Sequence, residues 1–100
     1  MTGLDFFQEI DVGGPAPIET DFVHIRREQV DLLCAAGLDL LSLDGKSAAA
    51  VELILRRSLG HIESLPRLFP TRTYGEVMEL LGTLILECEV APRTEVRVVG

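Results

Sequence analysis

Residues 28–43 read EQVDLLCAAGLDLLSL, and their apolar side chains recur at the i, i+3, i+4 and i+7 spacing of a helix. A second apolar row covers much of the remaining surface, so polar side chains occupy only about a quarter of the circumference. The pattern predicts one helix ending near residue 43 that is buried on more than one side, in the domain centre or against another subunit. The two rows are Val30, Leu33, Cys34, Gly37, Leu38 and Leu41, and Leu32, Ala36, Leu40 and Leu43.

After this stretch, Asp44-Gly45 predicts the end of the first helix and the start of a second. Either Asp44 or Ser47 is suited to cap the second helix, which is expected to run to about Ser64. The segment 66–70 begins and ends with proline and cannot be helical throughout.

The region that follows allows two interpretations. Residues 73–76 have the form of a capping box, and Gly82 is a plausible end for a short third helix. Residues 83–90 then alternate like a strand, which would place Val90 opposite Val96 of a last strand. The rival interpretation continues the third helix through the same residues. We favour the strand.

The first part of the chain predicts two strands. Residues 4–12 alternate with period two, and residues 13–17 (GGPAP) break the pattern. Residues 22–26 are β-branched and aromatic, which favours a second strand, although a first helical turn capped by Asp21 is the alternative. We therefore predict an α+β fold, with a three- or four-stranded antiparallel sheet from both chain ends and three central helices on one face.

Composition limits the class of protein. The 100 residues are 47% hydrophobic and carry a formal net charge of −7, which fits one compact domain over 1–100. Residues 1–44 hold nine acidic and two basic side chains, which argues against a nucleic-acid partner. No signal peptide or membrane span is predicted, and two cysteines fit a reduced, cytoplasmic protein. Many arginines and no asparagine indicate a bacterial or phage genome.

Motifs for metal, cofactor or catalytic chemistry are absent from the sequence. His24, His61, Cys34 and Cys88 do not stand at metal-ligand spacings, so we predict no metal and no cofactor. Both cysteines fall on apolar faces and are expected to be buried thiols. Gly45-Lys46-Ser47 resembles the end of a phosphate-binding loop, but the glycine required five residues earlier is Leu40.

Six residues are candidates for contact with a protein partner. Leu53 lies on the polar face of the second helix, and Leu68 and Phe69 stand between two prolines, so these three are candidate apolar anchors. Glu28, Asp31 and Asp39 form an acidic strip along the first helix that would steer a partner.

The first function hypothesis is a small non-catalytic interaction domain that acts as a homo-oligomer or binds a protein partner. An immunity or inhibitor protein would use the acidic half, whereas a phage assembly component would use the apolar surface. The alternative hypothesis is a small oligomeric α+β enzyme or ligand-binding protein with a site between sheet and helices.

Overall fold

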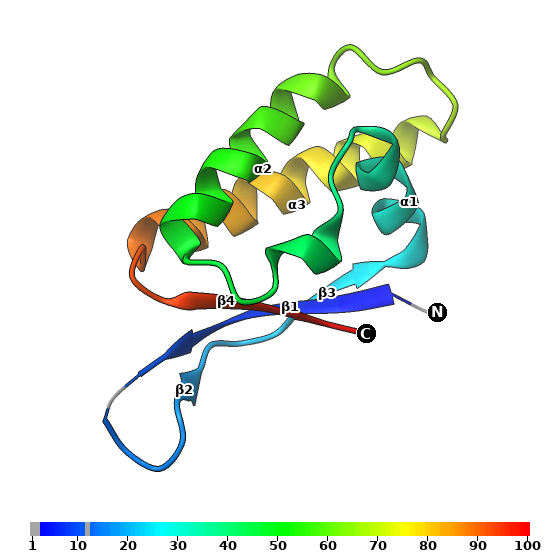
Figure 1. Ribbon diagram of the computed structural model, residues 1–100. Coiled ribbons are helices and arrows are strands. Elements are labelled where there is room, and N and C mark those ends of the chain that lie inside the picture. Colours follow the sequence, from blue (N-terminus) through cyan, green and yellow to red (C-terminus); the bar gives the residue numbers. More distant parts are fainter. Residues whose placement is uncertain (1–2, 12) are drawn as a thin grey trace.

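In the computed structural model, which describes residues 3–11 and 13–100, strand β1 (Gly3–Ile10) is the centre of an antiparallel sheet. One side of β1 pairs with β4 (Glu95–Val99). The other side pairs first with β3 (Val23–Arg26) and then, toward the end of β1, with the short β2 (Ile18–Glu19). Strands from both chain ends therefore meet on β1, and all three of its pairings are antiparallel, as expected (Figure 1).

The outer edge of β4 is covered by the chain segment 44–48. Val96 donates its N–H to the Lys46 carbonyl and accepts from the Gly45 N–H, both at 2.8 Å. Val98 donates its N–H to the Asp44 carboxylate at 3.0 Å, and Arg97 donates to the same oxygen at 2.8 Å. These bonds hold the pKa of Asp44 below its ordinary value, with the Arg97 hydrogen bond as the largest cause.

The helices lie together on one face of the sheet, as expected (Figure 1). They are α1 (Arg27–Ala35), a 3₁₀ turn η1 (Leu40–Leu43), α2 (Ala48–Ile62) and α3 (Thr71–Val90). Helices α2 and α3 pack against each other, and the core between the helices and the sheet is apolar. Its fully buried large side chains include Phe6, Ile25, Leu32, Leu33, Leu43, Leu55, Leu81 and Leu84.

The prediction of one helix ending near residue 43 is wrong, because α1 ends at Ala35. Gly37 has φ of +87°, and the Leu38 N–H reaches back to the Leu33 carbonyl at 2.9 Å. The Gly37 N–H bonds to the Cys34 carbonyl at 3.0 Å, which completes a Schellman motif. Glycine enters this left-handed conformation without a Cβ penalty, so the chain turns where the apolar periodicity alone predicted continuation.

This turn also removes the reason for expecting a second subunit against residues 27–43. The chain folds back on itself, and both apolar rows contribute to its own core. The buried side chains are Leu32, Leu33, Ala36, Leu38, Leu40 and Leu43. Leu41 is half exposed and Cys34 is exposed, so the expectation that Cys34 is buried is wrong, whereas Cys88 is buried.

Helix α2 begins as expected. The Ser47 hydroxyl accepts a hydrogen bond from the Ala50 N–H at 3.3 Å, and the helix ends at Ile62, two residues before the expected end. The loop that follows connects α2 to α3 at the end of the molecule opposite the β1–β2 hairpin (Figure 1).

Helix α3 overturns the favoured interpretation of residues 83–90, which are helical and not a strand. The helix begins at Thr71, so residues 73–76 do not form a capping box, and Gly82 lies within the helix. Helical periodicity explains the outcome, because one continuous face of α3 is buried. Its buried residues are Thr73, Tyr74, Val77, Leu81, Leu84, Ile85 and Cys88.

The expected pairing of Val90 with Val96 is consequently wrong. Val96 pairs with Gln8, and Val98 pairs with Phe6, so β4 adds to the N-terminal strand. Val96 and Val98 do point inward, as the alternation predicted. The expected second strand is confirmed over Val23–Arg26, and the alternative of a helical turn capped by Asp21 is wrong.

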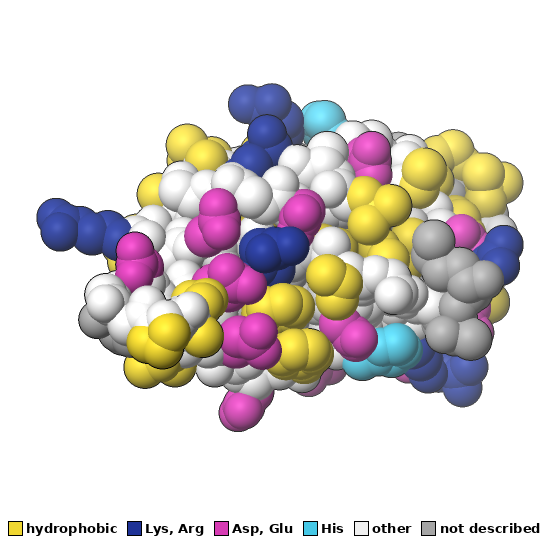
Figure 2. Space-filling view, turned by 60° about the horizontal axis from the view of Figure 1, so that its bottom comes forward, with side chains coloured by type: hydrophobic (Ala, Val, Ile, Leu, Met, Phe, Trp, Pro, Cys, Tyr) yellow, Lys and Arg dark blue, Asp and Glu magenta, His cyan; other side chains and the backbone are white. Residues whose placement is uncertain are grey.

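The face of the sheet that the helices leave open is not a continuous apolar surface. Phe7 points to this face, and the Phe22 ring covers it in a parallel stack with 4.2 Å between centroids, so Phe7 is only 5% exposed. Figure 2 shows that acidic, basic and histidine side chains separate the apolar ones on this face. They include the pairs His24–Asp5 and Arg97–Glu9.

Candidate functional site

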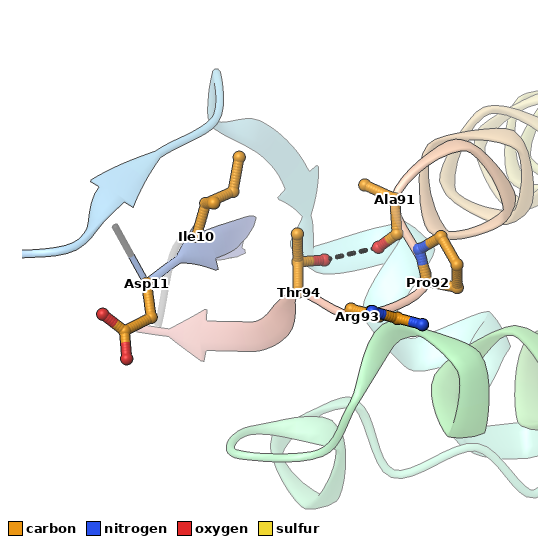
Figure 3. A pocket seen from close by; sticks show the side chains of 6 residues that line it. All are labelled: Ile10, Asp11, Ala91, Pro92, Arg93 and Thr94. Carbon is orange, nitrogen blue, oxygen red and sulfur yellow. Dashed lines mark hydrogen bonds between the residues drawn. The ribbon is translucent and has the colours of Figure 1, made fainter. Parts of the chain in front are cut away.

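The surface is hollowed where α3 ends above the far end of β1. Two adjoining hollows of about 460 and 360 Å³ lie there and share Ala91. We call them together the α3 groove. The first is lined by Ile10, Asp11, Ala91, Pro92, Arg93 and Thr94, and the second by Gln8, Thr20, Asp21, Leu86, Glu87, Val90 and Ala91. In Figure 3, Ile10 rises from the strand, and Ala91 and Pro92 lie across from it at the helix end, whereas Asp11 points the opposite way.

Several large apolar side chains at the groove are exposed to solvent. Leu86 and Val90 are 59% and 77% exposed, and their i, i+4 spacing puts them on one face of α3. On the sheet side, Ile10 pairs directly with Ile18, so both side chains are on the same face of the hairpin, and both are exposed. Two secondary-structure elements thus contribute exposed apolar side chains to adjoining hollows, Leu86 and Val90 from α3 and Ile10 from β1.

The floor of the groove is polar and fixed. The Gln8 side chain is buried and donates to the Thr94 hydroxyl at 2.6 Å, with longer contacts to the carbonyls of Glu87 and Ala91. The Thr94 hydroxyl donates in turn to the Ala91 carbonyl at 2.8 Å (Figure 3). Gln8 therefore ties the last turn of α3 to β1, which makes the groove a preformed feature of the fold.

Negative charge dominates the ionisable groups of the groove. Asp11, Asp21 and Glu87 line it, with Arg93 as the basic residue. Partial burial raises the pKa of Glu87, and repulsion from the Asp21 carboxylate raises it further. A positive group placed between these two carboxylates would offset the repulsion between them.

Leu68 and Phe69, two of the apolar anchors expected from the sequence, differ in their exposure to solvent. Leu68 is 79% exposed, the highest value among the large apolar side chains that the structure exposes. Phe69 instead packs against the core, with its ring edge-on to Tyr74 at 6.2 Å between centroids. Leu53 is 65% exposed on α2, as its place on the polar helix face predicted.

The three acidic residues expected to form one strip do not lie on one helix. Glu28 and Asp31 are exposed on α1, but Asp39 follows the turn at Gly37. The Asp39 carboxylate caps η1 by accepting from the Leu41 N–H at 3.2 Å. Their role as a steering rim stays a prediction.

The histidines do not gather into a site. His24 bonds through Nδ1 to the Asp5 carboxylate at 2.9 Å on the open face of the sheet, and His61 contacts the Ala36 carbonyl at 3.4 Å. Neither lines the α3 groove. Within residues 3–11 and 13–100, no group of three or more His, Cys, Asp or Glu side chains could hold a metal ion.

Cys88 is buried in an environment that disfavours its reactive thiolate form. Burial raises its pKa to about 11, and the carboxylates of Glu52 and Glu87 contribute in the same direction. The thiolate is the reactive form, so this cysteine is inert near neutral pH.

Sequence reasoning missed the α3 groove because it treated 83–90 as a strand. On a helix, Leu86 and Val90 fall outside the stripe formed by Val77, Leu81, Leu84 and Cys88. Two apolar residues one turn apart on an otherwise polar face were the signal available in the sequence.

No protein-family model matches the chain, and comparisons with curated proteins and solved structures give no match either. None of the helices in the described part of the chain is both long and apolar enough to cross a membrane. The site itself must therefore carry the functional argument.

Proposed function

We propose that this chain is a small non-catalytic interaction domain that binds a protein, either another copy of itself or a different partner, through the α3 groove. The observation that carries the proposal is that exposed Leu86 and Val90 of α3 line one hollow while Ile10 of β1 lines the adjoining one, with exposed Ile18 paired to Ile10. Exposed apolar side chains gathered from two elements mark interaction sites more often than single exposed leucines do.

The energetics favour such a contact. Covering one Leu or Val side chain completely is worth about 1.5–3 kcal/mol, so occupation of the groove offers more than any isolated apolar residue such as Leu53. The fixed floor at Gln8 favours binding further, because a preformed surface loses little conformational entropy.

The charge of the groove indicates the character of the partner surface. Asp21 and Glu87 would favour an apolar segment that carries a basic side chain. The overall charge of −7 would assist the approach of a basic surface.

The alternative of an enzyme or small-ligand protein has less support. The layer between sheet and helices is occupied by core side chains such as Phe6 and Leu81. The two hollows are of a size that suits small ligands, but no histidine lines them and they lie at the end of the molecule.

Site-specific photo-crosslinking tests the proposal. A benzophenone amino acid at Val90 should give discrete crosslinked species in cells that make the protein naturally, and Leu86→Ser should abolish them. The same probe at Glu79, exposed three turns earlier on α3, is the matched control. Identical patterns from both positions would refute the proposal.

A further inference from the structure

The loop between α2 and α3 presents Leu68 as a rigid apolar projection. We call residues 66–70 the Leu68 loop. Tyr74 donates its hydroxyl to the Pro66 carbonyl at 2.6 Å and accepts the Leu68 N–H at 3.2 Å. Proline stands at both ends of the loop, and the Phe69 ring packs inward on Tyr74. The backbone is thus held from several directions while the Leu68 side chain stays 79% exposed.

The surroundings of this projection are basic. The chain from 57 to 72 carries three arginines and one glutamate, and Arg67 directly precedes Leu68. The Arg67 guanidinium lies over the Tyr74 ring at 4.4 Å from its centroid, so it is held beside the exposed leucine. A fixed apolar side chain next to a fixed positive charge is the complement of an apolar groove that contains two carboxylates.

Resting on the function proposed above, we infer that the occupant of the α3 groove is the Leu68 loop of a second copy of this chain. Leu68 enters between Leu86 and Val90, and Arg67 lies toward Asp21 and Glu87. A loop fixed in advance loses little entropy on docking, and the charge pairing sets its orientation.

The geometry makes this contact head-to-tail. The molecule is 47 Å long. The Leu68 loop immediately precedes the start of α3, and the α3 groove is lined by residues at its C-terminal end; Figure 1 shows that these two ends of α3 are far apart. A chain therefore cannot occupy its own groove. Each copy keeps one free loop and one free groove, so association continues into rings or open chains rather than stopping at a symmetric dimer.

Sedimentation velocity over a hundredfold concentration range tests the inference on the intact protein. The average mass of the natural chain should rise with concentration. Leu68→Ser removes the projection, and Val90→Lys places a positive charge in the groove. Each change alters a residue more than three-quarters exposed, so folding should survive. Each should weaken association by about tenfold or more. Leu41→Ser, at a half-exposed leucine elsewhere, should associate like the natural chain.

Mixing the two variants gives the decisive result. The Leu68→Ser chain retains a working groove and the Val90→Lys chain retains a working loop, so an equimolar mixture should form a species of two subunits and no larger one. Failure of the mixture to associate, or normal association of Leu68→Ser alone, would overturn the inference.

The crosslinking experiment separates this inference from the proposed function. Products at Val90 whose masses are not multiples of the 11.0 kDa subunit would keep the interaction function and exclude a second copy as the occupant. If sedimentation shows the natural chain to be monomeric at every concentration, a second copy is likewise excluded as the occupant of the α3 groove.

Discussion

The two ends of β1 differ in what covers them, although the strand is continuous. Leu4 and Phe6 are 2% and 0% exposed beneath the helices, whereas Ile10, on the same face and four residues beyond Phe6, is 39% exposed. The difference arises because α3 ends at Val90 while β1 and its hairpin partner extend past it. Burial here follows from where a neighbouring element stops, and not from the hydrophobicity of the strand residues.

The largest effect expected from this comparison is on stability, when a side chain at either end of β1 is shortened to alanine. Phe6→Ala should lower the free energy of unfolding by about 3–5 kcal/mol, because it leaves a cavity in the core. Ile10→Ala should lower it by about 1 kcal/mol or less, because water already reaches that side chain. Urea denaturation of both variants checks this, and equal losses would show that the end of β1 is covered in solution.

An intermediate effect is expected at Gln8, which lies between these ends. Gln8→Leu keeps the volume but removes the hydrogen bond to the Thr94 hydroxyl, and should lower stability by about 1–2 kcal/mol. The Ala91 amide should also exchange its hydrogen faster, because the end of α3 is then tied less firmly to β1. Unchanged exchange at Ala91 would mean that Gln8 does not fix the groove floor.

The smallest effect is a pH-dependent one at Glu87. Its pKa is raised in the folded chain, so below about pH 4 both folded and unfolded states hold the proton and Glu87→Gln changes little. As the pH rises, the unfolded state releases its proton first, and the natural chain loses stability until the folded pKa is passed. The variant should therefore be more stable at neutral pH, by less than about 1 kcal/mol because much of the carboxylate meets water.

Thermal unfolding at pH 3.5 and pH 7 measures this difference. Glu79→Gln, on the exposed side of the same helix, controls for the loss of one negative charge. If Glu87→Gln were less stable than the natural chain at neutral pH, the carboxylate would have a stabilising partner in solution.

The sequence predicted those elements whose local signals and tertiary packing agree. The fold class and the strands at both chain ends are confirmed, and Ser47, one of the two caps expected for α2, caps it. It could not give the end of α1, because helical periodicity continues through Gly37 in the buried residues while the backbone turns there. At 83–90 two periodicities fit the same residues, and only packing against α1 and α2 selects the helix.

The candidate site was predicted only in part for the same reason. Exposure at Leu53 and Leu68 follows from local pattern, and both are exposed. The groove depends on two elements 76 or more residues apart in the chain, β1 and the end of α3, and on which of them is longer. No local pattern carries that information.

The segment 44–48 has a consequence for the behaviour of the protein at high concentration. This segment bonds to the N–H and C=O groups of Val96 and to the N–H of Val98. These groups of the outer edge of β4 therefore cannot pair with an incoming strand. The opposite margin is formed by two short strands, the two-residue β2 and the four-residue β3, which passes directly into α1. Crowded solutions of this chain should therefore resist cross-β fibrillation, and any polymer should dissolve again on dilution.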